Sequence, residues 1–455
     1  MMRFPLFLRL ALAIGLFIVP LAGPVQADEP DWKVGLARIK VTPEQPVMMA
    51  GYASRNRPFD KVTADLYAKA LALEDREGRL AVLVTADLIG LSAAIADPIC
   101  ARLAERAGLK REQILLTASH IHTGPSLSLS AESNSGQADG ERHRTIEYTL
   151  KLQDRLVDLV LESLKKREPA KLSWGTGVAN FVLNRRQWTP RGVILGMNAR
   201  GPADRTVPVL RIDTPEGKLR AIIFGAATHN TTLRPNCYEI CGDYAGFAQA
   251  NIEETHPGVQ AMFVLGLAGD SDPYPHGTME LARQHGHELS AEVERVLASK
   301  LEPVRGPLKL GYGIATLPME APARAELEKQ AATTGRDADS AKRLLESLDK
   351  GEKPRDHYDA PIAVWQFGDD LTWVALSGEV VVDYVALLEK ALGPNRLWLS
   401  AYANDYYGYL PSARILAEGG YESRGLGGIR FSPKAQDALT AKVRDIAVGI
   451  GRTVP

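Results

Sequence analysis

Residues 113–126 read QILLTASHIHTGPS, and this stretch decides how the chain is interpreted. An apolar run of β-type residues, Ile114–Thr117, leads into His120 and His122, and Gly124-Pro125 closes the loop. Alternate residues of an extended backbone point the same way, so both imidazoles can face one pocket. Neutral imidazole is the commonest protein ligand of zinc, so a His-x-His pair at a strand exit predicts a metal-binding or catalytic half-site. The alternative is two ordinary loop histidines.

The same arrangement, an apolar strand that ends in polar groups, recurs along the chain. Runs of four to eight apolar residues with β-branched members are typical of strands buried on both faces. Functional groups in layered α/β folds gather at strand ends, so these exits predict one shared site, although each could also be a polar loop start. The runs are Leu80–Thr85 before Asp87, Ile114–Thr117 before His120 and His122, Ala221–Phe224 before His229, Met262–Leu265 before Asp270-Ser271-Asp272, Trp373–Leu376 before Glu379, and Leu397–Leu399 before Asn404-Asp405.

Amphipathic helices lie between these strands. Apolar residues recur at helical spacing in residues 143–166, 278–298 and 433–449. Residues 322–352 are rich in Ala, Glu, Lys and Arg and predict a solvated helical insertion. Strands with interspersed helices predict an α/β fold, a layered sandwich of mixed β-sheets flanked by helices. The Ser-, Asn- and Gly-rich residues 126–142 predict a mobile flap beside the histidines.

The first segment indicates where the protein works. Arg3 and Arg9 precede an apolar stretch from Leu10 to Ala22, and small residues surround a cleavage position after Ala27. This order predicts a secretory signal peptide at residues 1–27, a periplasmic or secreted location, and one catalytic domain at residues 28–455. An uncleaved membrane anchor is the alternative. No later segment is apolar for long enough to span a bilayer.

Composition is that of a large globular enzyme, with 45% apolar and 24% charged residues. Removing residues 1–27 takes away two arginines and no acid, which moves the net charge from −1 to about −3 and argues against a nucleic-acid partner. Three cysteines do not make a disulfide framework. We expect Cys237 and Cys241 to be close enough to bridge and Cys100 to be free and buried in a helix, while a metal role for the Cys237–Cys241 pair is the less favoured alternative.

Taken together, these residues resemble the neutral (non-lysosomal) ceramidases and their bacterial relatives. The matching stretches follow one another in order along the expected mature chain. They are Met49-Ala50-Gly51-Tyr52, Ala86-Asp87-Leu88, residues 119–125, Asn184-Arg185, Thr228-His229-Asn230-Thr231-Thr232, Gly242-Asp243-Tyr244, Gly269-Asp270, Gly378-Glu379, Ala403-Asn404-Asp405-Tyr406, Tyr409 and Tyr421-Glu422.

The resemblance implies a site and an activity. In that family one zinc ion is held by the first histidine of the His-x-His pair, a later histidine, a glutamate and a tyrosine, which here would be His120, His229, Glu379 and Tyr409. The second histidine, the arginine of the Asn-Arg pair and a second tyrosine line the site, which points to His122, Arg185 and Tyr421. Metal-activated water would attack a carbonyl carbon while these lining groups stabilise the charge that develops on oxygen.

One departure concerns the motif Gly-Asp-x-Ser-Pro, whose serine is implicated in amide cleavage in that family. This chain reads Gly269-Asp270-Ser271-Asp272-Pro273, so Asp272 takes the place of the serine. An aspartate there would act as a general base on the metal-activated water or would bind a substrate amine.

The sequence therefore predicts a secreted, zinc-dependent hydrolase that cleaves a non-peptide amide bond in a small-molecule or lipid-like substrate. Two alternatives stay open. One is a true neutral ceramidase that acts on N-acylsphingosine, and the other is a catalytically degenerate relative that binds a ligand without turnover. The sequence does not indicate an oligomeric state.

Overall fold

The computed structural model describes Met1, residues 31–130 and residues 139–455. The strands are β1 (Trp32–Lys40), β2 (Lys61–Val62), β3 (Tyr67–Asp75), β4 (Leu80–Ala86), β5 (Ile114–Ala118), β6 (Glu168–Val178), β7 (Val182–Thr189), β8 (Gly192–Asn198), β9 (Thr206–Asp213), β10 (Leu219–Ala226), β11 (Glu239–Ile240), β12 (Gln260–Leu265), β13 (Ser271–Pro273), β14 (Glu302–Val304), β15 (Leu308–Glu320), β16 (His357–Phe367), β17 (Leu371–Leu376), β18 (Glu379–Val380), β19 (Leu397–Ser400), β20 (Tyr409–Leu410) and β21 (Arg430–Phe431). The helices are α1 (Ala93–Ala107), α2 (Asp139–Lys165), α3 (Asp243–Thr255), α4 (Met279–Leu297), α5 (Arg324–Ala331), α6 (Arg336–Asp349), α7 (Asp383–Leu392), α8 (Ala413–Glu418) and α9 (Lys434–Gly449).

A nine-stranded mixed sheet, in the order β12-β10-β9-β6-β1-β3-β4-β5 with β14 beside β6, forms the centre of the molecule. Strands β4 and β5 are buried on both faces, because their side chains alternate between two apolar layers. In β4, Val82 and Val84 pack with α1 and α2 in one cluster, whereas Leu83 packs with the second sheet in another. This double burial explains why the strand reads as a continuous apolar run.

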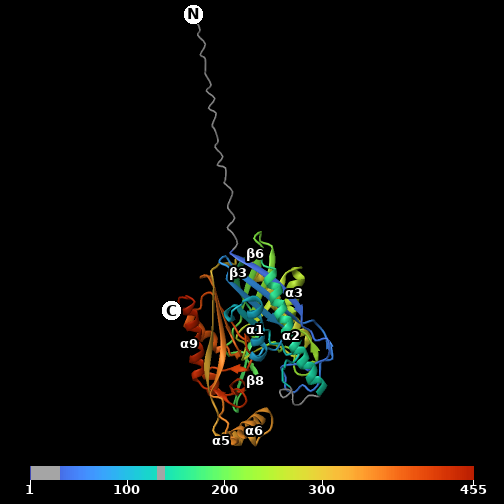
Figure 1. Cartoon of the computed structure of the whole chain (residues 1–455), viewed down its shortest axis with the longest axis vertical. Coiled ribbons are helices and arrows are strands. Elements are labelled where there is room, and N and C mark those ends of the chain that lie inside the picture. Colours follow the sequence, from blue (N-terminus) through green and yellow to red (C-terminus); the bar gives the residue numbers. More distant parts are fainter. Residues whose placement is uncertain (2–30, 131–138) are drawn as a thin grey trace.

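The second sheet has five strands in the order β19-β17-β16-β15-β21. Trp373 and Trp398 stack with ring centroids 4.4 Å apart, and both belong to the cluster that joins the two sheets. Helix α9 packs against β15 and β16 on this sheet. The result is the predicted layered sandwich of mixed sheets flanked by helices (Figure 1).

All six apolar runs that the sequence singles out are strands, and they occur as three parallel pairs. The pairs are β4 with β5, β10 with β12, and β17 with β19. Parallel neighbours have their carboxyl ends at the same edge of a sheet, so the residues that follow each pair of strands lie close together.

Two small sheets complete the surroundings of these strand ends. Strands β13, β7 and β8 form one, and the parallel pair β18 and β20 forms the other. The β7–β8 hairpin lies at the same end of the long axis as α5 and α6, whose residues fall within the segment 322–352 predicted to be helical (Figure 1).

Some expectations are corrected or lie outside the described residues. Cys237 and Cys241 are free thiols, so the expected bridge is wrong, while Cys100 is free and buried in α1 as predicted. The expected signal peptide and most of the expected flap, residues 131–138, are outside the described part of the chain. Within residues 31–130 and 139–455, no helix combines the length and apolar character needed to cross a bilayer.

Candidate active site

The strand exits bring two imidazoles, a carboxylate and a phenol together. His120 follows β5, and His229 follows β10. Glu379 begins β18 directly after β17, and the pairing of β18 with β20 sets Tyr409 opposite Glu379. All of these except Tyr409, which is half-buried, are buried.

Backbone carbonyls orient the two imidazoles. The Nδ1 atom of His120 lies 2.7 Å from the carbonyl oxygen of Ile89, and the Nδ1 atom of His229 lies 2.8 Å from that of Ala268. A carbonyl can only accept, so Nδ1 carries the proton in both rings, and in the neutral imidazole each Nε2 keeps its lone pair. Metal-binding histidines are typically held in this way.

The two Nε2 atoms converge on one carboxylate oxygen. Oε2 of Glu379 lies 3.3 Å from Nε2 of His120 and 3.1 Å from Nε2 of His229. The hydroxyl of Tyr409 lies 3.3 Å from the same atom of His229. Ligand atoms of a tetrahedral zinc ion, with bonds of about 2.0–2.1 Å, lie about 3.3 Å from one another. The spacing and the mixed N/O donor set therefore fit such an ion.

His122 lies beside this group. Its Nε2 atom is 3.1 Å from Nε2 of His120, and its Nδ1 atom is buried with no hydrogen-bond partner among the described residues. His120, His122 and His229 offer nitrogens within 4.8 Å of one another. By distance His122 can therefore be either a further donor or a lining group.

Tight packing fixes the rings. The ring centroid of Tyr402 lies 4.5 Å from that of His120, and the buried hydroxyl of Tyr402 has no partner in the described part of the chain. Gly51 has φ +90°, and a Cβ there would lie 2.4 Å from Cγ of the His122 ring. Only glycine fits at this position. His120 itself has φ 58°, a conformation that residues at functional sites often adopt.

The electrostatics favour neutral imidazoles beside a charged carboxylate. Burial lowers the pKa of His229, and burial and the neighbouring imidazoles lower the pKa of His122 well below its ordinary value. Burial alone would raise the pKa of Glu379, but His120 and His229 hold it well below its usual range. These are the protonation states in which such groups bind a cation.

Arg185, at the base of the β7–β8 hairpin, has all of its nitrogens engaged. Nε donates to Glu422 at 2.9 Å, Nη1 donates to Asp272 at 3.1 Å, and Nη2 donates to the carbonyl of Gly269 at 2.8 Å and to the hydroxyl of Tyr409 at 3.0 Å. The guanidinium group therefore positions Tyr409 and Asp272, and four of its five N–H groups are engaged within the protein.

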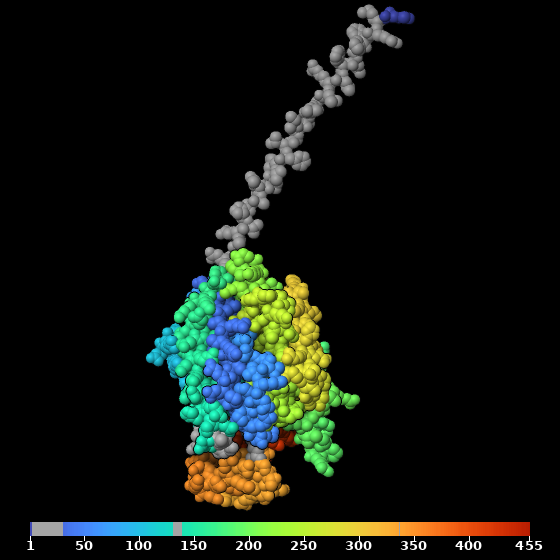
Figure 2. Space-filling model, turned by 90° about the vertical axis from the view of Figure 1, so that its right-hand side faces the viewer, coloured from blue at the N-terminus to red at the C-terminus, as the bar shows by residue number. Residues whose placement is uncertain are grey.

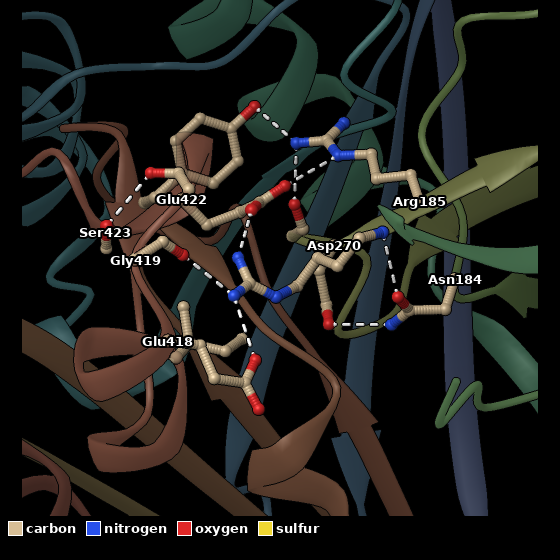
Figure 3. A network of polar contacts seen from close by, with 12 residues as sticks. Asn184, Arg185, Asp270, Glu418, Gly419, Glu422 and Ser423 are labelled. Atoms are coloured by element: carbon tan, nitrogen blue, oxygen red, sulfur yellow. Dashed lines mark hydrogen bonds and ion pairs between the residues drawn. The ribbon is translucent and has the colours of Figure 1, made fainter. Parts of the chain in front are cut away.

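Glu422 joins Arg185 to a second buried arginine (Figure 3). Arg186 donates to the other oxygen of Glu422 at 2.6 Å, and also to Glu418 at 3.0 Å and to the carbonyl of Gly419 at 2.8 Å. In the sequence, Glu422 is noticed only as the neighbour of Tyr421. No local signal indicates that Glu422 bridges Arg185 and Arg186, which lie more than two hundred positions away.

Asp272 is held as a carboxylate in an ion pair. Besides Arg185, it accepts a hydrogen bond from Thr231 at 3.2 Å and lies 3.5 Å from Nη1 of Arg234. Burial would raise the pKa of Asp272, but the surrounding cations outweigh burial and lower it. The hydroxyl of the adjacent Ser271 is buried with no partner among the described residues. Asp272 thus supplies a fixed negative charge and is a weak base.

The structure also places Tyr421 and the remaining polar strand exits. The Tyr421 ring lies 5.3 Å from the Tyr409 ring. Two of the six exits support the fold instead of the site. Asp87 accepts bonds from the backbone of Tyr67 and from Gln249, and no hydrogen bond joins its side chain to a histidine in the described part of the chain. At the last exit, Asn404 accepts from the backbone of Leu116, and Asp405 accepts from the backbone of Ala93 and from Tyr358.

Arg55 supports the site with no carboxylate partner among the described residues, and the sequence does not reveal it. Its guanidinium group donates to the carbonyls of Ala50, His122, Pro235 and Cys237. Burial lowers the pKa of Arg55 from its ordinary value. One buried cation therefore ties together three loops around His122.

Comparison with known proteins places this geometry in a family. The sequence model of the neutral/alkaline non-lysosomal ceramidase N-terminal region matches residues 32–274. The neutral ceramidase of Pseudomonas aeruginosa is 25% identical over 271 residues, which are 58% of this chain and 40% of that protein. The match to this curated relative thus spans less than half of the relative's length.

Solved structures show the same fold. A crystal structure of neutral ceramidase from Pseudomonas aeruginosa superposes with a TM-score of 0.72 at 20% identity, covering 94% of this chain and 76% of that one. A structure described as ceramidase complexed with C2 gives the same values. Because the family model matches more than half of the chain, this protein belongs to the neutral/alkaline non-lysosomal ceramidase family.

Proposed function

We propose that this chain is a secreted, zinc-dependent hydrolase that cleaves the amide bond of a small, lipid-like N-acyl substrate. The observation that carries the proposal is the convergence of Nε2 of His120 and His229 on one oxygen of Glu379, with the Tyr409 hydroxyl beside them. These four residues would hold the ion. A bound zinc ion would polarise the amide carbonyl and lower the pKa of a water molecule.

The surrounding residues have separate tasks in this proposal. His122 and Tyr421 would donate hydrogen bonds to the carbonyl oxygen as negative charge develops there. Arg185 would keep Tyr409 and Asp272 in place, as its four contacts support. Asp272 would bind a cationic or hydrogen-bond-donating group of the substrate, because its lowered pKa suits a fixed charge better than proton transfer.

Metal analysis of the purified protein tests the site. We expect about one zinc ion per chain, as a single four-ligand site requires. His229→Ala should remove the ion. His357→Ala, at an exposed histidine beside Asp356, should retain it. Wild-type protein that binds no divalent ion would contradict the proposal.

A panel of N-acyl amides with short and long acyl chains, including N-acylsphingosine, then tests the reaction. Cleavage of any member supports the hydrolase, and cleavage of N-acylsphingosine by the wild type would make it a true ceramidase. Metal binding without cleavage of any member would instead identify a degenerate binding protein. Asp272→Ser should shift the preference toward N-acylsphingosine if Asp272 sets specificity.

A further inference from the structure

The β7–β8 hairpin presents large apolar side chains to solvent. Trp188 is 59% exposed, Leu195 51%, and Ile194 and Met197 are each 48% exposed. In the space-filling view the hairpin projects as a green finger from the body of the molecule, near the end occupied by α5 and α6 (Figure 2). Monomeric proteins rarely expose such a cluster unless it contacts a partner or a membrane.

Exposed apolar side chains lie on both faces of the hairpin. Trp188 pairs with Val193 across the strands, so it shares a face with Leu195 and Met197. Ile194 lies between these positions and points to the opposite face. A flat protein surface can cover only one face of a hairpin, whereas lipid can surround both.

The charges of the hairpin favour an anionic surface. Residues 182–203 contain no Asp or Glu. Arg185 and Arg186, at the root, are committed to buried carboxylates. Arg191, in the turn, and Arg200, after β8, are exposed, and neither makes an ion pair within the described residues. Exposed arginines beside Trp and Leu are typical of segments that lie in the headgroup region of a membrane.

The same strand connects the finger to the candidate active site. Trp188 is three residues beyond Arg185, which is about 10 Å along an extended strand. We propose that the hairpin docks on an anionic lipid surface, with Trp188, Ile194, Leu195 and Met197 inserted among the lipids and Arg191 and Arg200 at the headgroups. Docking would hold the site within reach of an amide whose acyl chain is in the membrane.

Vesicle sedimentation tests the proposal. The chain without residues 1–27 is mixed with vesicles of phosphatidylcholine alone or of phosphatidylcholine with phosphatidylglycerol, so that the apolar run at 10–22 cannot itself bind lipid. Residues 1–27 are the expected signal peptide, so the shortened chain corresponds to the expected mature protein. We expect binding to the anionic vesicles, with Trp188 fluorescence quenched by brominated lipid.

Variants separate the two contributions. Trp188→Ala with Leu195→Ala should weaken binding about tenfold or more. Arg191→Gln with Arg200→Gln should weaken binding to the anionic vesicles about thirtyfold, because each surface cation contributes about fivefold. Leu150→Ala, at a residue that is 50% exposed on α2, is the matched control and should bind as the wild type does.

Two outcomes would overturn the proposal. One is hairpin variants that bind vesicles as well as the wild type does. The other is a wild type that ignores vesicles but self-associates in ultracentrifugation through the hairpin, which would make the finger a contact between protein copies. The docking proposal goes beyond the hydrolase proposal and is tested apart from it, because sedimentation needs no turnover and His229→Ala should bind vesicles normally.

Discussion

Replacing Glu422 by glutamine tests whether one carboxylate holds the buried arginine pair. The Glu422 side chain is 1% exposed and accepts from Nε of Arg185 at 2.9 Å and from Nη1 of Arg186 at 2.6 Å. Removing one partner of a buried ion pair costs about 3–5 kcal/mol. Glutamine keeps one acceptor, and a hydrogen bond to a charged group is worth about 1.5–3 kcal/mol. We therefore expect the free energy of unfolding to fall by about 2–3 kcal/mol.

Urea unfolding followed by tryptophan fluorescence measures this loss, and metal content and amide hydrolysis are measured on the same samples. Zinc should stay bound, since Glu422 bonds to none of the four proposed ligands, while hydrolysis should fall because Arg185 loses an anchor. Glu418→Gln is the matched control. Glu418 pairs with Arg186 and Arg414 but not with Arg185, so this variant should lose less stability and keep its activity. The reasoning is refuted if Glu422→Gln costs less than about 1 kcal/mol, well below the penalty for a broken buried pair, or if both variants behave alike.

Three further predictions concern backbone, charge and thiols. Gly51→Ala should cost about 1–3 kcal/mol of stability and reduce hydrolysis by displacing His122. The control Gly78→Ala, at φ +79° with open space around it, should cost stability alone, and equal activities of the two variants would contradict the packing argument. Burial raises the pKa of Asp270 from 3.8 to about 6, so the stability that this carboxyl group contributes is full below pH 3.8 and is lost as the pH rises through 6. The difference in unfolding free energy between wild type and Asp270→Asn should therefore change by about 3 kcal/mol across this window, and a constant difference would contradict the raised pKa. Burial raises the pKa of Cys100 to about 11 and that of Cys241 to about 12, so a thiol reagent at pH 8 should label the native protein mainly at the half-buried Cys237. After unfolding, all three thiols should react, whereas a single reactive thiol in the unfolded chain would reveal a disulfide.

The sequence predicts the framework of the site because burial on both faces leaves a readable pattern. A strand buried on both faces is apolar along its whole length, so the first polar residues after it mark where the strand ends. This change from apolar to polar residues singles out His120, His229 and Glu379 without coordinates. Asp87 fits the same pattern but only supports the fold. Pattern alone cannot separate a ligand from a hydrogen-bond acceptor for a neighbouring backbone.

Other features depend on distant partners and leave no local trace. Glu422 matters because Arg185 lies beside it in space, and Arg55 matters because three loops turn their carbonyls toward it. Tyr409 is suggested by family resemblance alone. The exposure of β8 could not be predicted from the sequence either. Ile194 and Leu195 have the apolar character of a buried strand, and only the structure shows that nothing in its described part covers them.

The anchoring of both proposed ligand histidines to main-chain carbonyls, at Ile89 and Ala268, has a consequence for how the protein can change. Main-chain carbonyls remain when neighbouring side chains are substituted, so the orientation of His120 and His229 does not depend on the identity of the surrounding side chains. Arg234, which is 32% exposed and 3.5 Å from Asp272, can then be exchanged to accept new substrates while both histidines stay anchored. Asp272 is less free to change, because it pairs with the buried Arg185 that also holds Tyr409. A library built at Arg234 is accordingly the direct route to altered selectivity.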